Sequence, residues 1–468
     1  MTDTDDDSYP RLTPADEGFT EAVYDGLFNT LVDDHAPDLV VAPRTEADIV
    51  AIVRAAALAG RQVAIRSGGH SWVAASVRRG SVLIDLAAFD SIALDVEGRT
   101  ATVGPAVRGA RLSKELVAHG LAFPVGHCGN PGVGGFLLGG GLGVNWGHWL
   151  PSAFSIRSVR VVLASGEVVV ASKTSNADLF WLARGAGPGF PGIVTEFVLD
   201  LQPLPPVIRL STWSFALDDL GAVTSWLTRV SPSLPSWVEV SMVTQGAGRP
   251  GATEGSEPFV VAVAATAFAD DEAAAFAALA LLDEGDGPGP GIRMLDHLDK
   301  VDVAFESLHE AVDATYPEGA RYRADTFWTA LDLHDALEPV RELMMRAPSA
   351  KTYILSGMPK NGDGQNLLPT GEAAYGMHDT TLVVPYVIWD DPADDDVNLA
   401  WLTELRAVLE PAATGHFISE ADLRHDRERV RRSFTATDWP RVEQLIARFD
   451  ETSLFCGFPM PAEGAQNR

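Results

Sequence analysis

A run of eighteen residues, GHCGNPGVGGFLLGGGLG at 126–143, constrains this chain more than any other feature, because nine of its residues are glycine. Glycine loses more backbone entropy on folding than any other residue, so such a density costs stability. That cost is offset only where the backbone must approach another group closely. We therefore expect residues 126–143 to wrap tightly around something that the folded chain holds.

A second glycine turn, RSGGHSW at 66–72, follows the strand-like run 61–66. Backbone N–H groups in such turns form concavities that suit phosphates. His70 stands in this turn and Cys128 in the first, so the two could flank one bound group. A redox cofactor with two attachable carbons fits that description. On the residues alone, simple turns with a solvated histidine and a small buried cysteine stay equally open.

The composition excludes several classes of protein. The 468 residues are 46% hydrophobic and 21% charged, which suits roughly two globular domains. The net charge of −29 argues against a nucleic-acid partner, because an acidic surface repels phosphates. No apolar run reaches the roughly 18 residues of a membrane span. The acidic start, MTDTDDDSYPRLTP, lacks the basic and apolar regions of a Sec signal, so we expect a short tail there and a cytoplasmic protein.

The cysteine count is equally restrictive. Only Cys128 and Cys456 are present, too few for a disulfide framework or for a metal site without nearby histidines. We expect no metal, and we interpret Cys456 as a packed core thiol.

The first half of the chain alternates strand and helix signals. Thr45 to Asp48 resembles a capping box at the start of a helix, between strands at 38–41 and 61–66. Asn176 is expected to cap a helix over 177–184. Further strands are expected at 81–86, in hairpins over 92–104 and over 156–171, and at 193–199, with a helix at 109–119.

The second half differs and predicts one antiparallel sheet with helices on a face. Pro203, Pro205 and Pro206 mark the boundary between the halves. Strands are expected at 208–217, 237–244, 258–268, 352–358 and 380–389, and helices at 218–230, 270–283, 301–313, 331–346 and 398–410. Residues 419–449 look helical, with Pro440 in the first position of a final helix.

Two other motifs predict nothing further. Residues 187–192 match G-x-G-x-x-G, but a helix precedes them and a strand follows, which is the wrong order for a dinucleotide fingerprint. The acidic run 390–396 lacks the glycine and final glutamate of an EF-hand loop. We expect neither a Rossmann site nor a calcium site.

Taken together, RSGGHSW, GHC and GGFLLGGGLG resemble the berberine-bridge-enzyme-like flavoprotein oxidases of the vanillyl-alcohol-oxidase/PCMH superfamily. The resemblance runs over 38–205, includes NADLFWLARGAGPGFPGIVTEF at 176–197, and resumes over 431–455. It implies an α+β fold with four parts. These are an N-terminal tail and lead-in segment (1–33), a PCMH-type FAD-binding domain (34–205), a substrate domain with an antiparallel sheet covered by helices (206–410), and a C-terminal segment that returns to the FAD domain (411–468).

The resemblance also implies covalently bound FAD. The histidine that matches His70 bonds the flavin 8α-methyl group, and the cysteine that matches Cys128 bonds flavin C6, while the glycines let the backbone reach the pyrophosphate. The residues that we expect to bind FAD are Arg66, Ser67, Gly68, Gly69, His70, Ser71, Gly126, Cys128, Gly132, Gly134, Gly135, Gly139, Gly140, Gly141, Ile193 and Val194.

Three departures from the family's pattern concern the substrate side. The Tyr-x-Asn near the C-terminus is replaced by residues 416–419 (HFIS), a histidine by Phe136, and Arg-x-Tyr-Gly by residues 147–150. The tyrosine base of many relatives is therefore missing, and FAD binding is little affected. We predict a base on the central sheet of the second domain.

Tyr386 is the first candidate for this base and Tyr322 the second. A catalytic phenol needs a pKa below its usual value of about 10. His378 or His416 could supply the positive charge that lowers it.

The resemblance implies an oxidase. A small organic substrate (a secondary metabolite, an alcohol or a sugar) gives a hydride to flavin N5, and O₂ reoxidises the flavin to give H₂O₂. Two other functions stay open: a flavin-loaded protein that binds or sequesters a small molecule, and a flavin dehydrogenase that does not use O₂. Trp146 and Trp149 either offer stacking area to an aromatic substrate or pack between the domains. The sequence specifies neither the substrate nor the oligomeric state.

Overall fold

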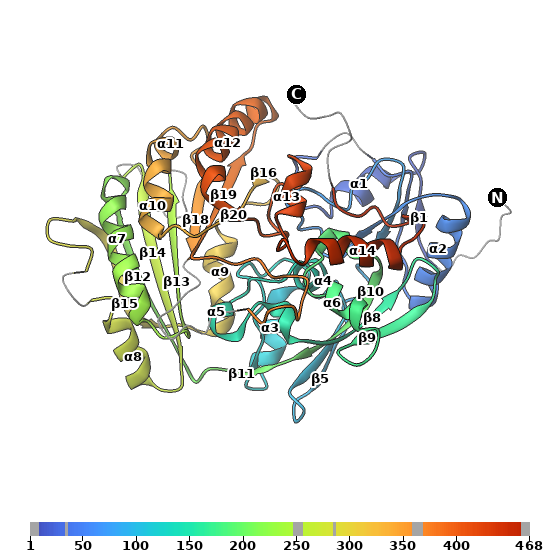
Figure 1. The fold of residues 1–468 in the computed structure, drawn as a ribbon, viewed down its shortest axis with the longest axis horizontal. Coiled ribbons are helices and arrows are strands. Elements are labelled where there is room, and N and C mark those ends of the chain that lie inside the picture. Colours follow the sequence, from blue (N-terminus) through green and yellow to red (C-terminus); the bar gives the residue numbers. More distant parts are fainter. Residues whose placement is uncertain (1–8, 33–35, 247–255, 284–286, 358–367, 460–468) are drawn as a thin grey trace.

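The computed structural model describes residues 9–32, 36–246, 256–283, 287–357 and 368–459. Figure 1 shows a large sheet with its helices on the left and a set of smaller sheets on the right. This mixed architecture confirms the α+β fold class. Among the described residues, every helix is too short or too polar to cross a bilayer. The expected tail at 1–8 lies outside the described residues.

A four-stranded sheet in the order β1-β2-β4-β3 opens the first domain, with β2, β3 and β4 parallel. The elements of this layer are β1 (Arg11–Leu12), α1 (Phe19–Tyr24), β2 (Leu39–Val41), α2 (Glu46–Leu58), β3 (Val63–Arg66) and β4 (Val82–Asp85). The capping box is confirmed, because the Thr45 side chain accepts a bond from the Asp48 amide and the Asp48 side chain accepts from the Thr45 amide. The expected tail is shorter than residues 1–14, since Arg11–Leu12 pair with β2.

A five-stranded antiparallel sheet, in the order β5-β6-β10-β8-β9, completes the first domain, beside the pair β11-β7. Its elements are β5 (Ile92–Asp95), β6 (Thr100–Val103), α3 (Gly109–Val117), β7 (Leu121–Ala122), α4 (Val133–Leu138), α5 (Trp146–Trp149), β8 (Ile156–Val162), β9 (Val168–Ser172), α6 (Ala177–Leu182), β10 (Ile193–Asp200) and β11 (Gln202–Pro203). Both expected hairpins are confirmed. Asn176 precedes α6 as expected. Its side-chain Nδ2, however, donates to the carbonyl of Val170 at 2.9 Å, and the side chain makes no bond that caps the helix.

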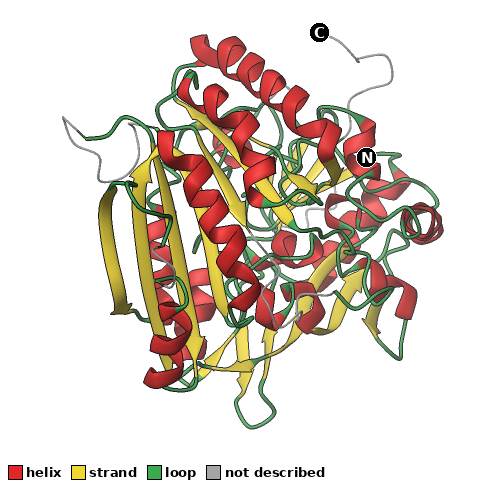
Figure 2. Ribbon diagram, turned by 60° about the vertical axis from the view of Figure 1, so that its left-hand side comes forward, coloured by secondary structure: helices red, strands yellow, loops and turns green. Residues whose placement is uncertain are grey.

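The second domain is one antiparallel sheet of nine strands, in the order β15-β12-β14-β13-β18-β19-β17-β20 with β16 paired to β19. Figure 2 shows helices lying across one face of it. Its elements are β12 (Val207–Ala216), α7 (Leu220–Val230), β13 (Val238–Gln245), β14 (Val260–Ala269), α8 (Glu272–Ala280), β15 (Met294–Asp302), α9 (Leu308–Asp313), β16 (Arg321–Ala324), β17 (Phe327–Thr329), α10 (Leu333–Leu337), α11 (Arg341–Met345), β18 (Tyr353–Gly357), β19 (Thr381–Trp389), α12 (Asp395–Leu409) and β20 (Ala413–Gly415).

The two faces of this sheet pack against different parts of the protein. Successive side chains of a strand point to opposite faces, and β19 shows this division clearly. Val383 and Val387 join the core formed with α7, α8, α10 and α12. Val384, Tyr386 and Ile388 belong to a separate cluster that also contains Trp72 of the first domain. The second face therefore meets the first domain and supplies one wall of the region between them.

Two expected helices in the second half are shorter than expected. Residues 301–302 end the edge strand β15, and the expected helix 301–313 shrinks to a 3₁₀ turn at Phe305–Ser307 and α9. Pro339 has no N–H to donate, and the expected helix 331–346 is divided there into α10, a 3₁₀ turn at Glu338–Val340 and α11.

The C-terminal stretch is also less helical than expected. Residues 419–449 contain only α13 (Arg427–Arg431) and α14 (Trp439–Phe449), and Pro440 is the second residue of α14, not the first. In Figure 1, α14 lies over the first domain. Arg441 and Arg448 both pair with Asp178 of α6. β20 pairs with β17, so the return to the first domain begins after residue 415, later than the expected 411.

The end of the described chain is bound to the first domain by backbone and by core contacts. The Val63 amide donates to the carbonyl of Leu454 at 2.8 Å, and the Cys456 amide donates to the carbonyl of Val63 at 2.9 Å. Phe455 is buried in the core beneath α2. Cys456 packs against a neighbouring cluster, where burial raises the pKa of its thiol to about 11.

This packing predicts the effect of one substitution. Phe455→Ala should lower the free energy of unfolding by about 3–5 kcal/mol, because Phe455 is buried in the core beneath α2 and its removal leaves the neighbouring side chains without contacts. Urea denaturation followed by circular dichroism measures the loss. Leu58→Ala is the matched control: Leu58 is 90% exposed, so its removal should change stability by less than about 0.5 kcal/mol. Equal stabilities for Phe455→Ala and the unmodified protein would contradict the structural role of the C-terminal segment.

Candidate active site

A cavity of about 1210 Å³ lies where the two domains meet. It exceeds the roughly 300–1,000 Å³ of pockets for drug-sized ligands, so it has room for a dinucleotide together with a substrate. Both glycine turns line it, together with the lead-in segment, the sheet of the second domain and the loop that follows β20. Of the residues expected to bind FAD, the cavity is lined by Arg66, Ser67, Gly68, Gly69, His70, Ser71, Gly126, Cys128, Gly132, Gly134, Gly135 and Val194.

The two glycine turns touch each other. A Cβ atom on Gly68 would lie 2.4 Å from the backbone nitrogen of Gly132, so neither turn can retreat to admit a side chain. Gly69 has a φ of 72°, a conformation that other residues rarely adopt. Arg108 joins the turns, because its Nη1 donates to the carbonyls of Gly68 at 2.8 Å and Asn130 at 2.6 Å. Nothing in the sequence around Arg108 indicated this role.

His70 is held as a neutral ring. Its imidazole stacks on Phe28, with the ring centroids 4.8 Å apart and the planes 16° from parallel. Burial, and secondarily the charge of Arg108, lower the pKa of His70 to about 4. At neutral pH a ring nitrogen of His70 therefore keeps a free lone pair, which is the state that a bond to an electrophilic carbon requires.

Cys128 lies in a different electrostatic environment. Burial, and then the carboxylates of Asp313 and Glu420, raise the pKa of the Cys128 thiol well above its ordinary value. Asp313 also accepts a bond from the Gly129 amide at 3.0 Å. The Cys128 side chain is therefore held as a protonated thiol at neutral pH.

Four residues expected to bind FAD lie outside the cavity lining. A Cβ atom on Gly139 would meet Ser419 Oγ at 1.8 Å, one on Gly140 the ring of Tyr375 at 2.7 Å, and one on Gly141 the side chain of Ser152 at 2.9 Å. Ile193 is fully buried in the core beneath α2. The last glycines of the run thus allow close packing against other parts of the protein and not against a ligand.

Arg66 borders the cavity, but its charged group serves the lead-in segment. Its guanidinium donates to the carbonyls of Ala22 and Val23 at 2.6 and 2.7 Å and to the carboxylate of Asp85 at 2.6 Å. Arg66 therefore holds α1 against the glycine turn at 66–72.

A wall of aromatic rings faces the glycine turns across the cavity. The Tyr386 ring lies 5.0 Å from the rings of Trp72 and Tyr353 and 5.5 Å from that of Tyr316. The Tyr386 hydroxyl donates to Glu420 Oε2 at 2.7 Å. Burial, and then the charge of Glu420, raise the pKa of Tyr386 well above 10. The expected lowering of this pKa by a positive charge is wrong.

The other expected catalytic residues lie elsewhere. Tyr322 is buried outside the cavity lining, stacks on Phe28 and donates its hydroxyl proton to the carbonyl of Pro317. His378 lies 3.4 Å from the carbonyl of Gly376 through Nδ1, and it is absent from the described lining. His416 is fully buried, donates to the carbonyl of Thr326 at 2.6 Å and does not reach the cavity. The structure therefore contradicts the expectation that His378 or His416 assists Tyr386.

Glu420 is the functional candidate that sequence reasoning missed. Its carboxylate lines the cavity in the loop after β20, and burial raises its pKa above the ordinary value for glutamate. A signal was present, because Glu420 directly follows residues 416–419, where the family's Tyr-x-Asn is missing.

The cavity also has a charged end next to Cys128. His127 Nε2 donates to Glu239 Oε1 at 2.6 Å, and the Asn145 amide donates to the other oxygen of Glu239. Burial disfavours the His127 cation, but the pairing with Glu239 outweighs it and raises the pKa of His127.

The two tryptophans after the glycine run have separate places. Trp146 lines the cavity. Trp149 packs against Phe268 and Phe305 of the second domain. Trp149 thus serves domain packing, whereas Trp146 can contact a ligand.

Known proteins resemble this chain at two levels, in the first domain and over almost the whole length. Residues 37–172 match the model of the FAD binding domain. An FAD-linked oxidoreductase of Hypoxylon pulicicidum is 30% identical over 436 residues, which cover 92% of this chain and 92% of that protein. The xylooligosaccharide oxidase of Thermothelomyces thermophilus is 27% identical over 454 residues, covering 92% of this chain and 88% of the oxidase.

Solved structures show the same fold. The berberine-bridge-enzyme-like protein 1 of Physcomitrella patens superposes with a TM-score of 0.81 at 18% identity, over 96% of each chain. The 6-hydroxy-D-nicotine oxidase of Arthrobacter nicotinovorans superposes with a TM-score of 0.80 at 20% identity, over 96% of this chain and 97% of that one. With the two glycine turns meeting at one cavity, these similarities show that the chain belongs to the FAD-linked oxidoreductases and has the fold of the berberine-bridge-enzyme-like proteins.

Proposed function

We propose that the protein is an oxidase that uses FAD to dehydrogenate a small organic substrate and O₂ as the electron acceptor. Bound FAD would supply hydride acceptance and electron transfer to O₂, which yields H₂O₂. The observation that carries the proposal is the single cavity shared by the two glycine turns and by Tyr386 and Glu420. One side of this cavity fits a dinucleotide, and the other offers acid–base groups to a substrate.

The glycine turns fit FAD because backbone forms much of their surface. A Cβ atom on Gly135 would meet nothing within 4 Å, and the turn lines the cavity. Residues 67–71 and Gly135 would hold the pyrophosphate through backbone N–H groups, while the N–H groups of Val133 and Gly134 bond carbonyls within the protein. His70 and Cys128 would attach the flavin covalently, His70 through its neutral ring and Cys128 after loss of its thiol proton.

Glu420 is the group that we propose as the base. The carboxylate accepts a proton from the substrate's O–H or N–H group, while the Tyr386 hydroxyl stays protonated and holds the carboxylate by its 2.7 Å bond. A raised carboxyl pKa places this base closer to neutral pH, where proton transfer is most effective. A catalytic carboxylate favours an enzyme over a protein that only sequesters a ligand.

The cavity wall supports an organic substrate with an apolar or aromatic body. Trp72, Trp146, Tyr316 and Tyr353 supply ring surface, which buries apolar groups well. The His127–Glu239 pair can receive a hydroxyl or another polar group at the far end. Aromatic secondary metabolites and alcohols are therefore proposed ahead of sugars.

Oxygen consumption tests the reaction. The purified flavoprotein should consume O₂ and release an equal amount of H₂O₂ with at least one compound from a panel of aromatic metabolites, alcohols and sugars. Flavin bleaching without O₂ uptake would identify a dehydrogenase. A perturbed flavin spectrum without any bleaching would identify a binding protein, and either result would contradict the oxidase assignment.

Acid precipitation tests the covalent attachment. The yellow colour should stay with the precipitated protein. His70→Ala and Cys128→Ala should each leave one attachment, and the double variant should release the flavin. Cys456→Ala is the control for loss of the other thiol that borders the cavity, and it should keep both attachments, since the resemblance assigns the flavin bonds to His70 and Cys128. If Cys128→Ala leaves the mass of the tryptic flavopeptide unchanged, attachment at Cys128 is refuted.

Substitution of Glu420 tests the base. Glu420→Gln should lower kcat/KM about 10²–10⁴-fold, the usual contribution of a general base. The unmodified enzyme should lose activity as the pH falls through the raised pKa of Glu420, and this acid limb should vanish in the variant. Tyr386→Phe should cost less, because it removes a donor and not the base. Retention of the acid limb in a folded, flavin-loaded Glu420→Gln enzyme would exclude Glu420 as the base.

A further inference from the structure

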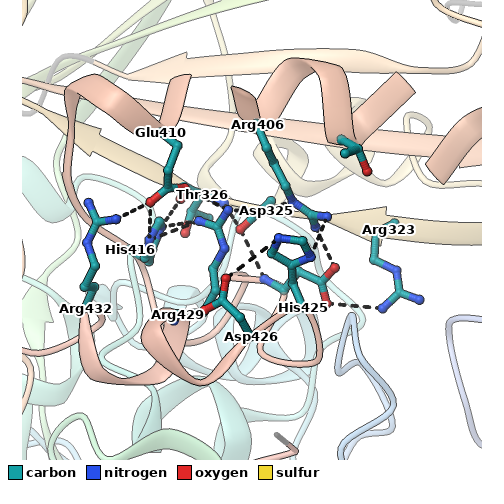
Figure 3. Close-up of polar contacts among 12 residues, drawn as sticks. Arg323, Asp325, Thr326, Arg406, Glu410, His416, His425, Asp426, Arg429 and Arg432 are labelled. Atoms are coloured by element: carbon teal, nitrogen blue, oxygen red, sulfur yellow. Dashed lines mark hydrogen bonds and ion pairs between the residues drawn. The ribbon is translucent and has the colours of Figure 1, made fainter. Parts of the chain in front are cut away.

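A network of charged side chains lies beside the cavity, where β16, α12, α13 and the loop after β20 meet (Figure 3). Its centre is buried: Asp325 is fully inaccessible, and Asp422, Arg406 and Arg429 are nearly so. None of these four side chains lines the cavity as described. No step of the proposed reaction uses them, so their role needs a separate explanation.

Asp325 is the hub of this network. Its Oδ2 accepts a bond from Arg406 Nε at 2.7 Å and pairs with Arg429 Nη2 at 3.1 Å. Its Oδ1 accepts from the backbone amides of Thr326 at 2.9 Å and Asp422 at 3.2 Å. Burial alone would raise the pKa of Asp325, but the two arginines lower it, so the carboxylate stays charged.

Two of the hub's bonds reach the backbone next to the acid–base pair. The Asp325 amide donates to the carbonyl of Pro385, the residue before Tyr386, at 3.3 Å. The Asp422 amide, two residues after Glu420, donates to the Asp325 side chain. Through these bonds one aspartate joins the strand that carries the phenol to the loop that carries the carboxylate.

The loop is held on the other side of Glu420 as well. The Phe417 amide donates to Thr326 Oγ1 at 2.8 Å. Ser419 Oγ donates to the carbonyl of Gly139 at 3.2 Å, and a Cβ atom on Gly139 would collide with this hydroxyl. Glu420 thus sits in a short span of chain that is tied down at 417, 419 and 422.

Arg406 bonds both aspartates of the network, Asp325 and Asp422. Its Nη2 donates to Asp422 Oδ2 at 2.6 Å while its Nε serves Asp325. Arg323 pairs with the other oxygen of Asp422 at 3.2 Å. Replacing buried ion pairs by apolar side chains is often neutral or stabilising, so stability alone explains such a cluster poorly. Holding the loop in one position is a task that directional, charged hydrogen bonds perform well.

We propose that Asp325 is a positioning residue for the Tyr386–Glu420 pair. Its backbone N–H bonds the carbonyl of Pro385, and its side chain holds the Asp422 amide and Arg406, so that the loop keeps the carboxylate at hydrogen-bond distance from the phenol. The inference rests on the proposed role of Glu420 for its catalytic consequence, but the geometric claim stands by itself. During turnover Asp325 neither gains nor loses a proton. It keeps Glu420 where a substrate proton can be transferred to it.

Asp325→Asn tests this inference, because it keeps the side-chain shape and removes the charge that holds Arg406 and Arg429. A crystal structure of the flavin-loaded variant should show the Tyr386–Glu420 distance longer than 2.7 Å. The value of kcat should fall more than about tenfold, as general-base catalysis is lost, with KM little changed. The Tyr386 bond lowers the pKa of Glu420, so its weakening should move the acid limb of kcat/KM to higher pH.

Glu410→Gln is the matched control from the outer edge of the same network. Glu410 pairs with Arg429, Arg432 and His416, which lie away from the backbone next to Tyr386 and Glu420. Glu410→Gln should lower the melting temperature, as Asp325→Asn does. It should leave the Tyr386–Glu420 distance and the acid limb of kcat/KM unchanged.

Thr326→Val is a second test in case Asp325→Asn does not fold. It removes the hydroxyl that accepts the Phe417 amide and should shift the acid limb in the same direction by less. If either folded variant lowers only the melting temperature, with the distance and acid limb of the unmodified enzyme, the positioning role is overturned. If Glu420→Gln keeps full activity, the proposed base fails, and the crystallographic distance still decides whether Asp325 positions the pair.

Discussion

The contact between Gly68 and Gly132 is the constraint on which the rest of the molecule depends. Backbone nitrogen stands where a side chain would have to be, and Arg108 bonds both turns so that they stay together. Only because the turns meet can His70 and Cys128, far apart in the chain, face one cavity. The aromatic wall of the second domain then closes the space that the turns leave open.

The chain carries a net charge of −29, yet the carboxylates inside it are each matched to a partner. Glu239 pairs with His127, Asp325 with Arg406, and Glu420 with the Tyr386 hydroxyl. The partners differ in charge, and the pKa values of the carboxyl groups differ accordingly. Arginines keep Asp325 ionised, whereas a neutral phenol cannot offset the burial of Glu420, and the pKa of that carboxyl rises. Asp325 and the proposed base, Glu420, thus lie near each other with pKa values shifted in opposite directions.

The sequence predicted those features whose causes are local or repetitive. The Thr45 capping box, both hairpins and the long strands of the second domain follow from spacing. Features that depend on residues distant in the sequence were not predicted. Gly139 to Gly141 look like the rest of a ligand loop, but their neighbours are Ser419, Tyr375 and Ser152. β15 is polar and becomes a strand by pairing with β12. His416 faces arginines that lie in a later helix and not a ligand.

The missing tyrosine of the family motif has a physical explanation in this wall. The ring centroids of Tyr316, Tyr353 and Tyr386 lie 5.0 to 6.0 Å from one another, and burial raises the pKa of all three. A phenolate among them would repel Glu420 and lack a cation to stabilise it. A carboxylate ionises several pH units below a phenol, so the same burial that disables a tyrosine base brings a glutamate toward neutral pH. In the proposed reaction, the carboxyl of Glu420 would therefore supply the proton transfer in a pocket too apolar for a tyrosinate.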